Sequence, residues 1–293
     1  MAPTKRAIRR AERQERKTVR KKRAAARRVR RRVAPTTAHH LTTPHLCLLR
    51  APSHATQLQP RGRDISVATY NVHRWTGLNG RGASDPARAG FVISELKADV
   101  VALQEVMRPH TGEDPLVALA DAMGFHVTFA ATRVHKRGEI GNAILSRWPI
   151  AGVSMLDLSF SRVERRVAVS ARLRFDSGDL DVVATHLSLT DRTRHRQVRA
   201  LLDHPDLQTA PTLLLGDMNA WRNCKATQAL DDELREHHNL DWPASFPSAA
   251  PVFALDRVYA RGVKVTALKA HTSRAAQRAS DHLPVIARVR LPA

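Results

Sequence analysis

Several polar side chains of this sequence stand where predicted buried strands end. They carry carboxylate, amide or imidazole groups, and they are Asn71, Glu105, His186, Asp217, Asn219, Asp256, Asp281 and His282. Asp217 and Asn219 follow the leucine run 213–215 and Gly216, and residues two apart in an extended chain point to the same face. A buried carboxylate is unfavourable unless it meets a metal ion, a partner or a substrate. The pattern therefore predicts a polar site at one edge of a sheet.

The residue types in this group indicate metal-assisted hydrolysis. Glu105, Asn71 and Asp281 offer hard oxygen donors, which suit Mg²⁺ or Mn²⁺. Histidines beside carboxylates, as in Asp281-His282, suit proton transfer near neutral pH. No cysteine belongs to the group and no serine stands in a nucleophile-elbow motif, so water is the expected nucleophile. A metal ion, an activated water and groups that stabilise a developing anion together predict hydrolysis of a phosphate ester.

Each of these residues also has an ordinary structural interpretation. Asn71 could form a turn, and Glu105 could be a solvated residue after a strand. His186 could be a core histidine with satisfied hydrogen bonds, and Asp256 could pair locally with Arg257. The recurrence of such residues at strand ends favours the functional interpretation, because active sites are built at the edges of rigid sheets.

The elements that must position these side chains follow from the hydrophobic pattern. A strand is predicted over 65–71 and another over 99–104, with helices beginning at Pro86 and Pro115. A basic helix is expected over 192–202 and a further helix after Ala220. Later strands are predicted at 127–131, 140–146, 152–157, 166–175, 180–186, 213–215, 254–259, 263–270 and 283–289. Many strands with helices between some of them predict two sheets flanked by helices rather than simple β-α alternation.

Charge is unevenly distributed along the 293 residues, whose formal net charge is +21. Residues 1–33 hold 16 Lys or Arg against 2 Glu, which predicts a basic disordered tail. Residues 34–63 are interpreted as a linker, and 64–293 as the folded domain. The tail would bind nucleic acid or an anionic membrane through counterion release. The alternatives are a solubilising tail or an upstream stretch that the cell does not translate.

Cysteine content and hydropathy favour a cytoplasmic protein. Cys47 and Cys224 stand in neither a disulfide framework nor a metal-type spacing. No apolar run is long enough to span a bilayer, and the charged N-terminus lacks the apolar core of a secretory signal. We expect a peripheral association with nucleic acid or membrane through the tail, and the sequence indicates no obligate protein partner.

Short motifs in fixed order give the chain a family resemblance. They are Thr69-Tyr70-Asn71, Leu103-Gln104-Glu105-Val106, Gly141-Asn142-Ala143-Ile144-Leu145-Ser146-Arg147, Thr185-His186-Leu187, Gly216-Asp217-Met218-Asn219, Leu255-Asp256-Arg257 and Ser280-Asp281-His282-Leu283-Pro284. With these motifs, residues 64–291 resemble the endonuclease/exonuclease/phosphatase superfamily. That superfamily includes deoxyribonuclease I, abasic-site endonucleases, inositol polyphosphate phosphatases and neutral sphingomyelinases. The resemblance implies an α+β fold, a four-layer α-β-β-α sandwich of two mixed sheets flanked by helices.

The resemblance also implies a role for each matching residue. Glu105 would hold the metal ion, Mg²⁺ or Mn²⁺, assisted by Asn71 and Asp281. Asp217 would orient or deprotonate the attacking water, and Asn219 would fix Asp217 and touch the phosphate.

Three further residues complete the implied catalytic set. His282, paired with Asp256, would stabilise the phosphoryl oxygens or act as the base, and His186 would contact the scissile phosphate from the other side. Contacts to the substrate phosphate would come from Arg165, Arg166 and Asn142. Ile140 departs from the family pattern, since an aromatic residue often precedes the Gly-Asn-Ala motif.

Three functions are consistent with these observations. The first is a metal-dependent phosphodiesterase that acts on DNA or RNA, and the second is hydrolysis of a phospholipid or small phosphoester at a membrane surface. Basic charge serves both, because both substrates are anionic. The third, a binding module with a decayed site, is opposed by the intact Glu105, Asp217, Asn219 and His282.

Overall fold

The computed structural model describes residues 47–54, 63–81, 83–160, 164–175, 178–208, 211–235 and 240–292. The predicted tail and most of the predicted linker lie outside these residues. Within the linker, Cys47–Arg50 forms strand β1, which pairs antiparallel with β4 (His126–His135). The linker prediction does not hold for these 4 residues, because their strand depends on hydrogen bonds to a distant segment and is too short to show periodicity.

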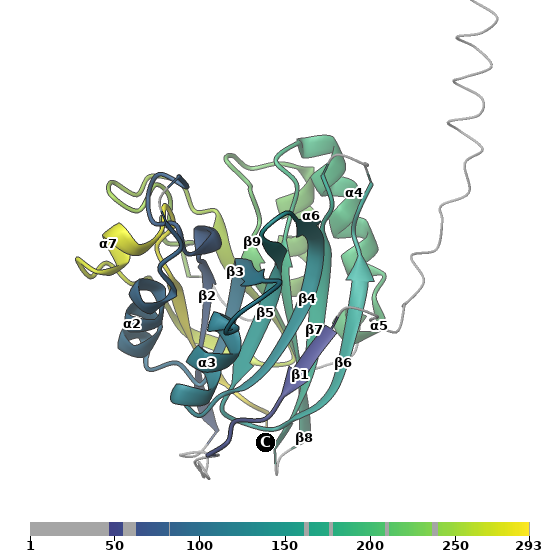
Figure 1. Ribbon diagram of the computed structural model, residues 1–293. Coiled ribbons are helices and arrows are strands. Elements are labelled where there is room, and N and C mark those ends of the chain that lie inside the picture. The colour runs from purple at the N-terminus through teal and green to yellow at the C-terminus, as the bar shows by residue number, and fades with distance from the viewer. Residues whose placement is uncertain are drawn as a thin grey trace, which may run out of the picture. The chain divides into compact units, whose positions relative to one another are not determined.

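Two mixed β-sheets are formed by the described residues (Figure 1). The larger has 7 strands in the order β1, β4, β5 (Gly138–Ser146), β3 (Val100–Pro109), β2 (Asp64–Asn71), β12 (Val285–Arg290) and β11 (Lys264–Ala270). The smaller has 5, in the order β10 (Asp256–Arg261), β9 (Thr212–Asp217), β8 (Gly178–His186), β7 (Val167–Phe175) and β6 (Ile150–Asp157). Strands β2 and β3 are parallel, as are β8 and β9, while the other neighbouring pairs are antiparallel.

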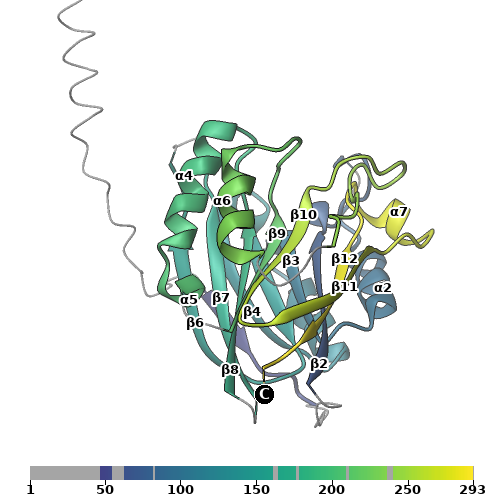
Figure 2. The ribbon, with the colours of Figure 1, turned by 180° about the vertical axis from the view of Figure 1, so that it is seen from behind.

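Helices cover the outer face of each sheet (Figure 2). On the larger sheet lie α2 (Pro86–Leu96), α3 (Pro115–Ala122) and α7 (Ala276–Ala279), and on the smaller lie α4 (Asp191–Leu202), α5 (Pro205–Gln208) and α6 (Lys225–Leu234). Side chains alternate between layers: Leu213 and Leu215 of β9 pack between the sheets, whereas Leu214 packs against the helices. The four-layer α-β-β-α sandwich is confirmed.

The predicted helix starts are also confirmed. Pro86 and Pro115 occupy the first turn of α2 and α3. A backbone N–H at this position has no partner within the helix, so its absence in proline loses no helical hydrogen bond. The Asp85 carboxylate accepts a hydrogen bond from the Arg88 N–H (3.3 Å), and Asp114 caps α3 in the same way. None of the described helices combines the length and the apolar character that a bilayer span requires.

Strands β8, β9 and β10 carry three candidate residues in one row. His186 lies opposite Asp217 in the parallel β8–β9 pair, and Asp217 lies opposite Asp256 in the antiparallel β9–β10 pair. Gly216 permits this register, because a β-carbon there would lie 1.9 Å from the Thr185 carbonyl oxygen of β8. The glycine of the Gly-Asp-Met-Asn motif therefore holds β8 and β9 at their spacing, and the row of polar side chains depends on it.

We predict that Gly216→Ala destabilises the protein by about 2 kcal/mol or more, because the backbone of β8 must move to admit the methyl group. Gly152→Ala is the matched control, since a β-carbon there meets its nearest neighbour at 3.9 Å. Urea unfolding of both variants measures the difference. Equal stability of the two would contradict the proposed clash.

Candidate active site

A cleft with a volume of about 360 Å³ opens where the candidate residues gather. Ten of the eleven residues predicted from the sequence line it: Asn71, Glu105, Asn142, Arg165, Arg166, His186, Asp217, Asn219, Asp281 and His282. The eleventh, Asp256, is fully buried and contacts His282. The structure thus brings the whole predicted set to one place, from segments of both sheets.

Asp217 makes polar contacts with four residues at this site, Asn71, His186, Asn219 and His282. Its Oδ2 accepts a hydrogen bond from the Asn71 amide (3.1 Å) and lies 3.3 Å from His186 Nε2. Its Oδ1 accepts a hydrogen bond from the backbone N–H of Asn219 (2.9 Å). Burial raises the pKa of Asp217 to about 6, and the positive charge of His282 opposes the shift. A carboxylate whose pKa is this close to neutral can take up and release a proton under physiological conditions.

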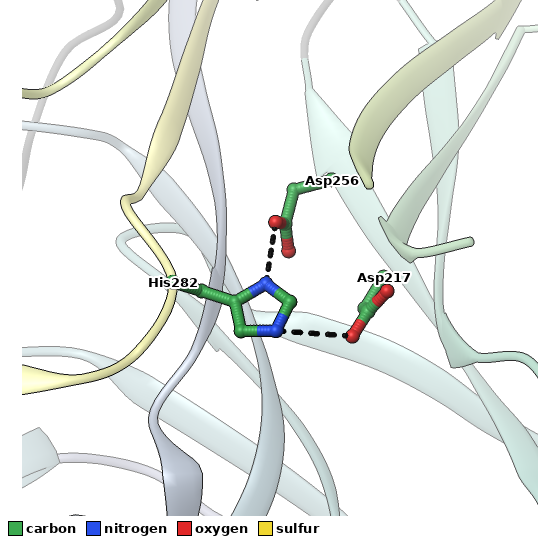
Figure 3. Close-up of side chains that lie close together, drawn as sticks. All are labelled: Asp217, Asp256 and His282. Carbon is green, nitrogen blue, oxygen red and sulfur yellow. Dashed lines mark hydrogen bonds and ion pairs between the residues drawn. The ribbon is translucent and has the colours of Figure 1, made fainter. Parts of the chain in front are cut away.

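His282 lies between two carboxylates (Figure 3). Its Nδ1 is 2.8 Å from Asp256 Oδ2, and its Nε2 is 3.6 Å from Asp217 Oδ2. The Ser245 hydroxyl donates to the same oxygen of Asp256 (2.6 Å), which fixes that carboxylate. Burial disfavours the charged ring, but the carboxylates of Asp256 and Asp217 outweigh it and raise the pKa of His282 to about 10. The ring is therefore a buried cation at the cleft wall.

His186 is neutral, in contrast to the cationic His282. Burial, and then the nearby positive charges of Arg166 and His282, lower the pKa of His186 well below its usual value, so the ring is neutral. An Nη1 N–H of Arg166 lies 3.3 Å from His186 Nδ1. A guanidinium has only donors, so Nδ1 accepts and the ring proton sits on Nε2, facing Asp217. Arg166 is fixed in turn by Glu164 (3.1 Å).

Glu105 and Asp281 are the candidate metal-binding carboxylates. Both line the cleft, and their side chains are 27% and 28% exposed, which leaves oxygens accessible to an ion. Their hard oxygen donors fit Mg²⁺ or Mn²⁺. The Asn71 amide already donates to Asp217, and its oxygen accepts from the His73 N–H (3.0 Å), so it has one lone pair left for an ion.

A second group of potential metal donors is formed by Asp217, Asp256 and His282, whose ligand atoms lie within 4.8 Å of one another. Both ring nitrogens of His282 face carboxylate oxygens, so protons already occupy the positions between these donors. This hydrogen-bonded arrangement suits proton transfer and charge stabilisation, whereas Glu105 and Asp281 keep exposed carboxylate oxygens.

Left-handed backbone is concentrated at this site. Among the described non-glycine residues, positive φ occurs at His73, Arg74, Trp75, Glu105 and Asn219, and elsewhere only at Lys97, which ends α2. Such conformations are unfavourable for residues with a β-carbon and persist where surrounding contacts enforce them, often at functional sites. The backbone therefore marks the same region as the side chains do.

Several contacts at the site were not predicted from the sequence. They involve His73 and Arg74, which contact the two candidate metal-binding carboxylates, Glu164, which holds Arg166, and Ser245, which holds Asp256. Glu164 precedes Arg166 by two residues, and that proximity was an available signal. Ser245 has none, because it reaches Asp256 from an irregular segment. Asn142 uses its amide N–H to bind the Val167 carbonyl (2.8 Å), which links the two sheets beside the cleft.

A profile of the Endonuclease/Exonuclease/phosphatase family matches residues 57–282. The chain belongs to this family. Members of the endonuclease/exonuclease/phosphatase family are hydrolases that act on phosphate esters. The uncharacterized protein YbhP of Escherichia coli (strain K12) is 30% identical over 257 residues, which cover 78% of this chain and 96% of YbhP.

Solved structures of the family have the same fold. The endonuclease/exonuclease/phosphatase from Beutenbergia cavernae is 27% identical with a TM-score of 0.64, over 78% of this chain and 72% of that one. TDP2 of D. rerio, solved with a single strand DNA product, is 17% identical with a TM-score of 0.57, over 78% and 99%. At this identity, TDP2 shows the fold alone.

Proposed function

We propose that this protein is a divalent-metal-dependent phosphodiesterase that cleaves DNA or RNA by attack of water. The observation that carries the proposal is the hydrogen-bonded set around Asp217, in which a buried carboxylate of raised pKa lies between a neutral and a cationic histidine. A base next to a fixed cation suits water attack on phosphorus, where a proton must leave as negative charge develops.

Each residue is assigned a role by its contacts. Asp217 accepts the proton of the attacking water, with its carboxylate oriented by Asn71 and the Asn219 N–H. The Nε2 N–H of neutral His186 faces Asp217. The positive charge of His282 stabilises the phosphoryl oxygens. A divalent ion bound by Glu105 and Asp281 would neutralise charge on the phosphate.

The charges along the cleft support an extended anionic substrate. Its lining includes four arginines, Arg74, Arg133, Arg165 and Arg166. Exposed arginines of α4, such as Arg192 and Arg196, add positive charge on the surface. A nucleic-acid strand, whose charges repeat along its backbone, can engage such separated cations together.

One observation favours a membrane substrate instead. Leu189 and Trp221 line the cleft and are 59% and 41% exposed, so apolar surface surrounds the candidate phosphate site. Exposed apolar residues beside basic ones suit contact with an anionic bilayer. Phospholipid hydrolysis is therefore the second candidate function.

The deciding experiment is a parallel assay of plasmid, abasic oligonucleotide, RNA, sphingomyelin and phosphoinositide with Mg²⁺ or Mn²⁺, each with a chelator control. We expect cleavage of nucleic acid that the chelator abolishes. Faster turnover of either lipid would support the second candidate. Hydrolysis that persists in the chelator would contradict the metal dependence.

Glu105→Gln tests the metal assignment separately. We predict that this variant loses about 100-fold or more in turnover at low Mn²⁺ and regains part of it at high Mn²⁺, because a neutral amide binds the ion more weakly. Glu113→Gln, which removes an exposed carboxylate outside the cleft lining, is the matched control. An equal effect of both substitutions would contradict the assignment.

A further inference from the structure

The turn that follows Asn71 is left-handed over three consecutive residues. His73, Arg74 and Trp75 have φ values of 45°, 57° and 63°. One tertiary and one local hydrogen bond hold the turn. The buried Trp75 indole donates to the Met107 carbonyl (2.8 Å), and the Trp75 backbone N–H donates to the Val72 carbonyl (2.9 Å). None of the three is a glycine, so this conformation is imposed by packing.

The turn directs two basic side chains onto the two candidate metal-binding carboxylates. Arg74 Nε lies 3.4 Å from Glu105 Oε2, and His73 Nδ1 lies 3.1 Å from Asp281 Oδ1. The backbone of Gly80 lies close to both basic side chains, since a β-carbon there would be 2.7 Å from His73 Nε2 and 2.9 Å from Arg74 Nη2. Arg74 Nε is buried and makes no hydrogen bond with the described residues, so its interaction with Glu105 is an ion pair.

We propose that Arg74 competes with the divalent ion for Glu105 and so sets the ion concentration at which the site fills. This inference rests on the metal dependence proposed above. A guanidinium carries a permanent charge, so it remains a cation at every physiological pH. An ion that binds Glu105 competes with this ion pair and experiences the repulsion of the guanidinium at short range. The native site consequently binds the ion more weakly than its carboxylates alone would.

The test is a direct titration of the protein with Mn²⁺ alone, followed by the electron paramagnetic resonance signal of the free ion, without substrate. We expect Arg74→Gln to bind Mn²⁺ at least about threefold more tightly than wild type, since the variant removes both the competing ion pair and the repelling charge. Arg74→Asn provides a second neutral variant, because asparagine tolerates the left-handed backbone at this position. Arg133→Gln removes a different charge from the cleft lining and is expected to change the affinity less.

The possible outcomes separate this inference from the proposed function. If wild type binds Mn²⁺ and Glu105→Gln weakens binding, but neither Arg74 variant tightens it, competition by Arg74 is wrong while the metal site stands. Weaker binding in the Arg74 variants would show that the guanidinium only positions Glu105, and would also overturn the inference. Absence of Mn²⁺ binding in every protein would overturn both the metal dependence and this inference.

Discussion

An Asp217→Asn variant is expected to hydrolyse its substrate at least about a thousandfold more slowly than wild type, because the amide cannot accept the proton of the attacking water. Asparagine is about as large as aspartate, and its amide oxygen can still accept the hydrogen bond that Asn71 donates to Asp217. Burial raises the pKa of Asp217, which means that the folded state disfavours its charge at neutral pH. Thermal unfolding of the variant is therefore expected at the wild-type temperature or above it.

Asp181→Asn is the matched control for this experiment. Asp181 is another buried aspartate. It belongs to β8, lies outside the cleft lining and forms an ion pair with Arg172 (2.8 Å). Its replacement should lower stability and leave turnover within a few fold of wild type. Near-normal turnover of Asp217→Asn, measured on protein whose unfolding curve is intact, would refute the assignment of the base.

His282→Gln is expected to impair both turnover and stability. Removal of the cation leaves Asp217 and Asp256 buried without the charge between them, and breaking a buried pair in this way costs about 3 kcal/mol or more. Turnover should fall about a thousandfold, because the positive edge next to the developing phosphate charge is lost.

A second substitution separates the two effects. Adding Asp256→Asn to His282→Gln removes the carboxylate that lost its partner, so part of the stability should return while hydrolysis remains absent. Denaturant unfolding and steady-state kinetics on the same preparations measure both quantities. If turnover returned together with stability, the role of His282 would be structural and not chemical.

Some strand-end positions could be predicted because the signal is local, but Glu105 lies within β3 (Val100–Pro109), at the register shift between Leu103 and Val106, and not at the end of a strand. A short apolar run followed by Asp217 indicates both the strand and the point where it leaves the core, and the same holds for Asn71 and His186. The helix starts at Pro86 and Pro115 are local in the same sense.

What could not be predicted depends on pairing between distant segments. The row formed by His186, Asp217 and Asp256 requires the order and register of β8, β9 and β10, which no single strand specifies. Strand β1 exists only through its pairing with β4. The left-handed turn at Arg74 contains no glycine, and only the tertiary contacts of Trp75 account for it.

The division of the site between two sheets has a consequence for biosynthesis. Asn71 and Glu105 are translated early, but His282 is translated after every other candidate catalytic residue. Strand β2, which carries Asn71, pairs with β3 on one side and with β12 (Val285–Arg290) on the other. A nascent chain therefore cannot assemble the site until β12 has been synthesised, so the folding of the larger sheet and the formation of the site both wait for one of the last strands.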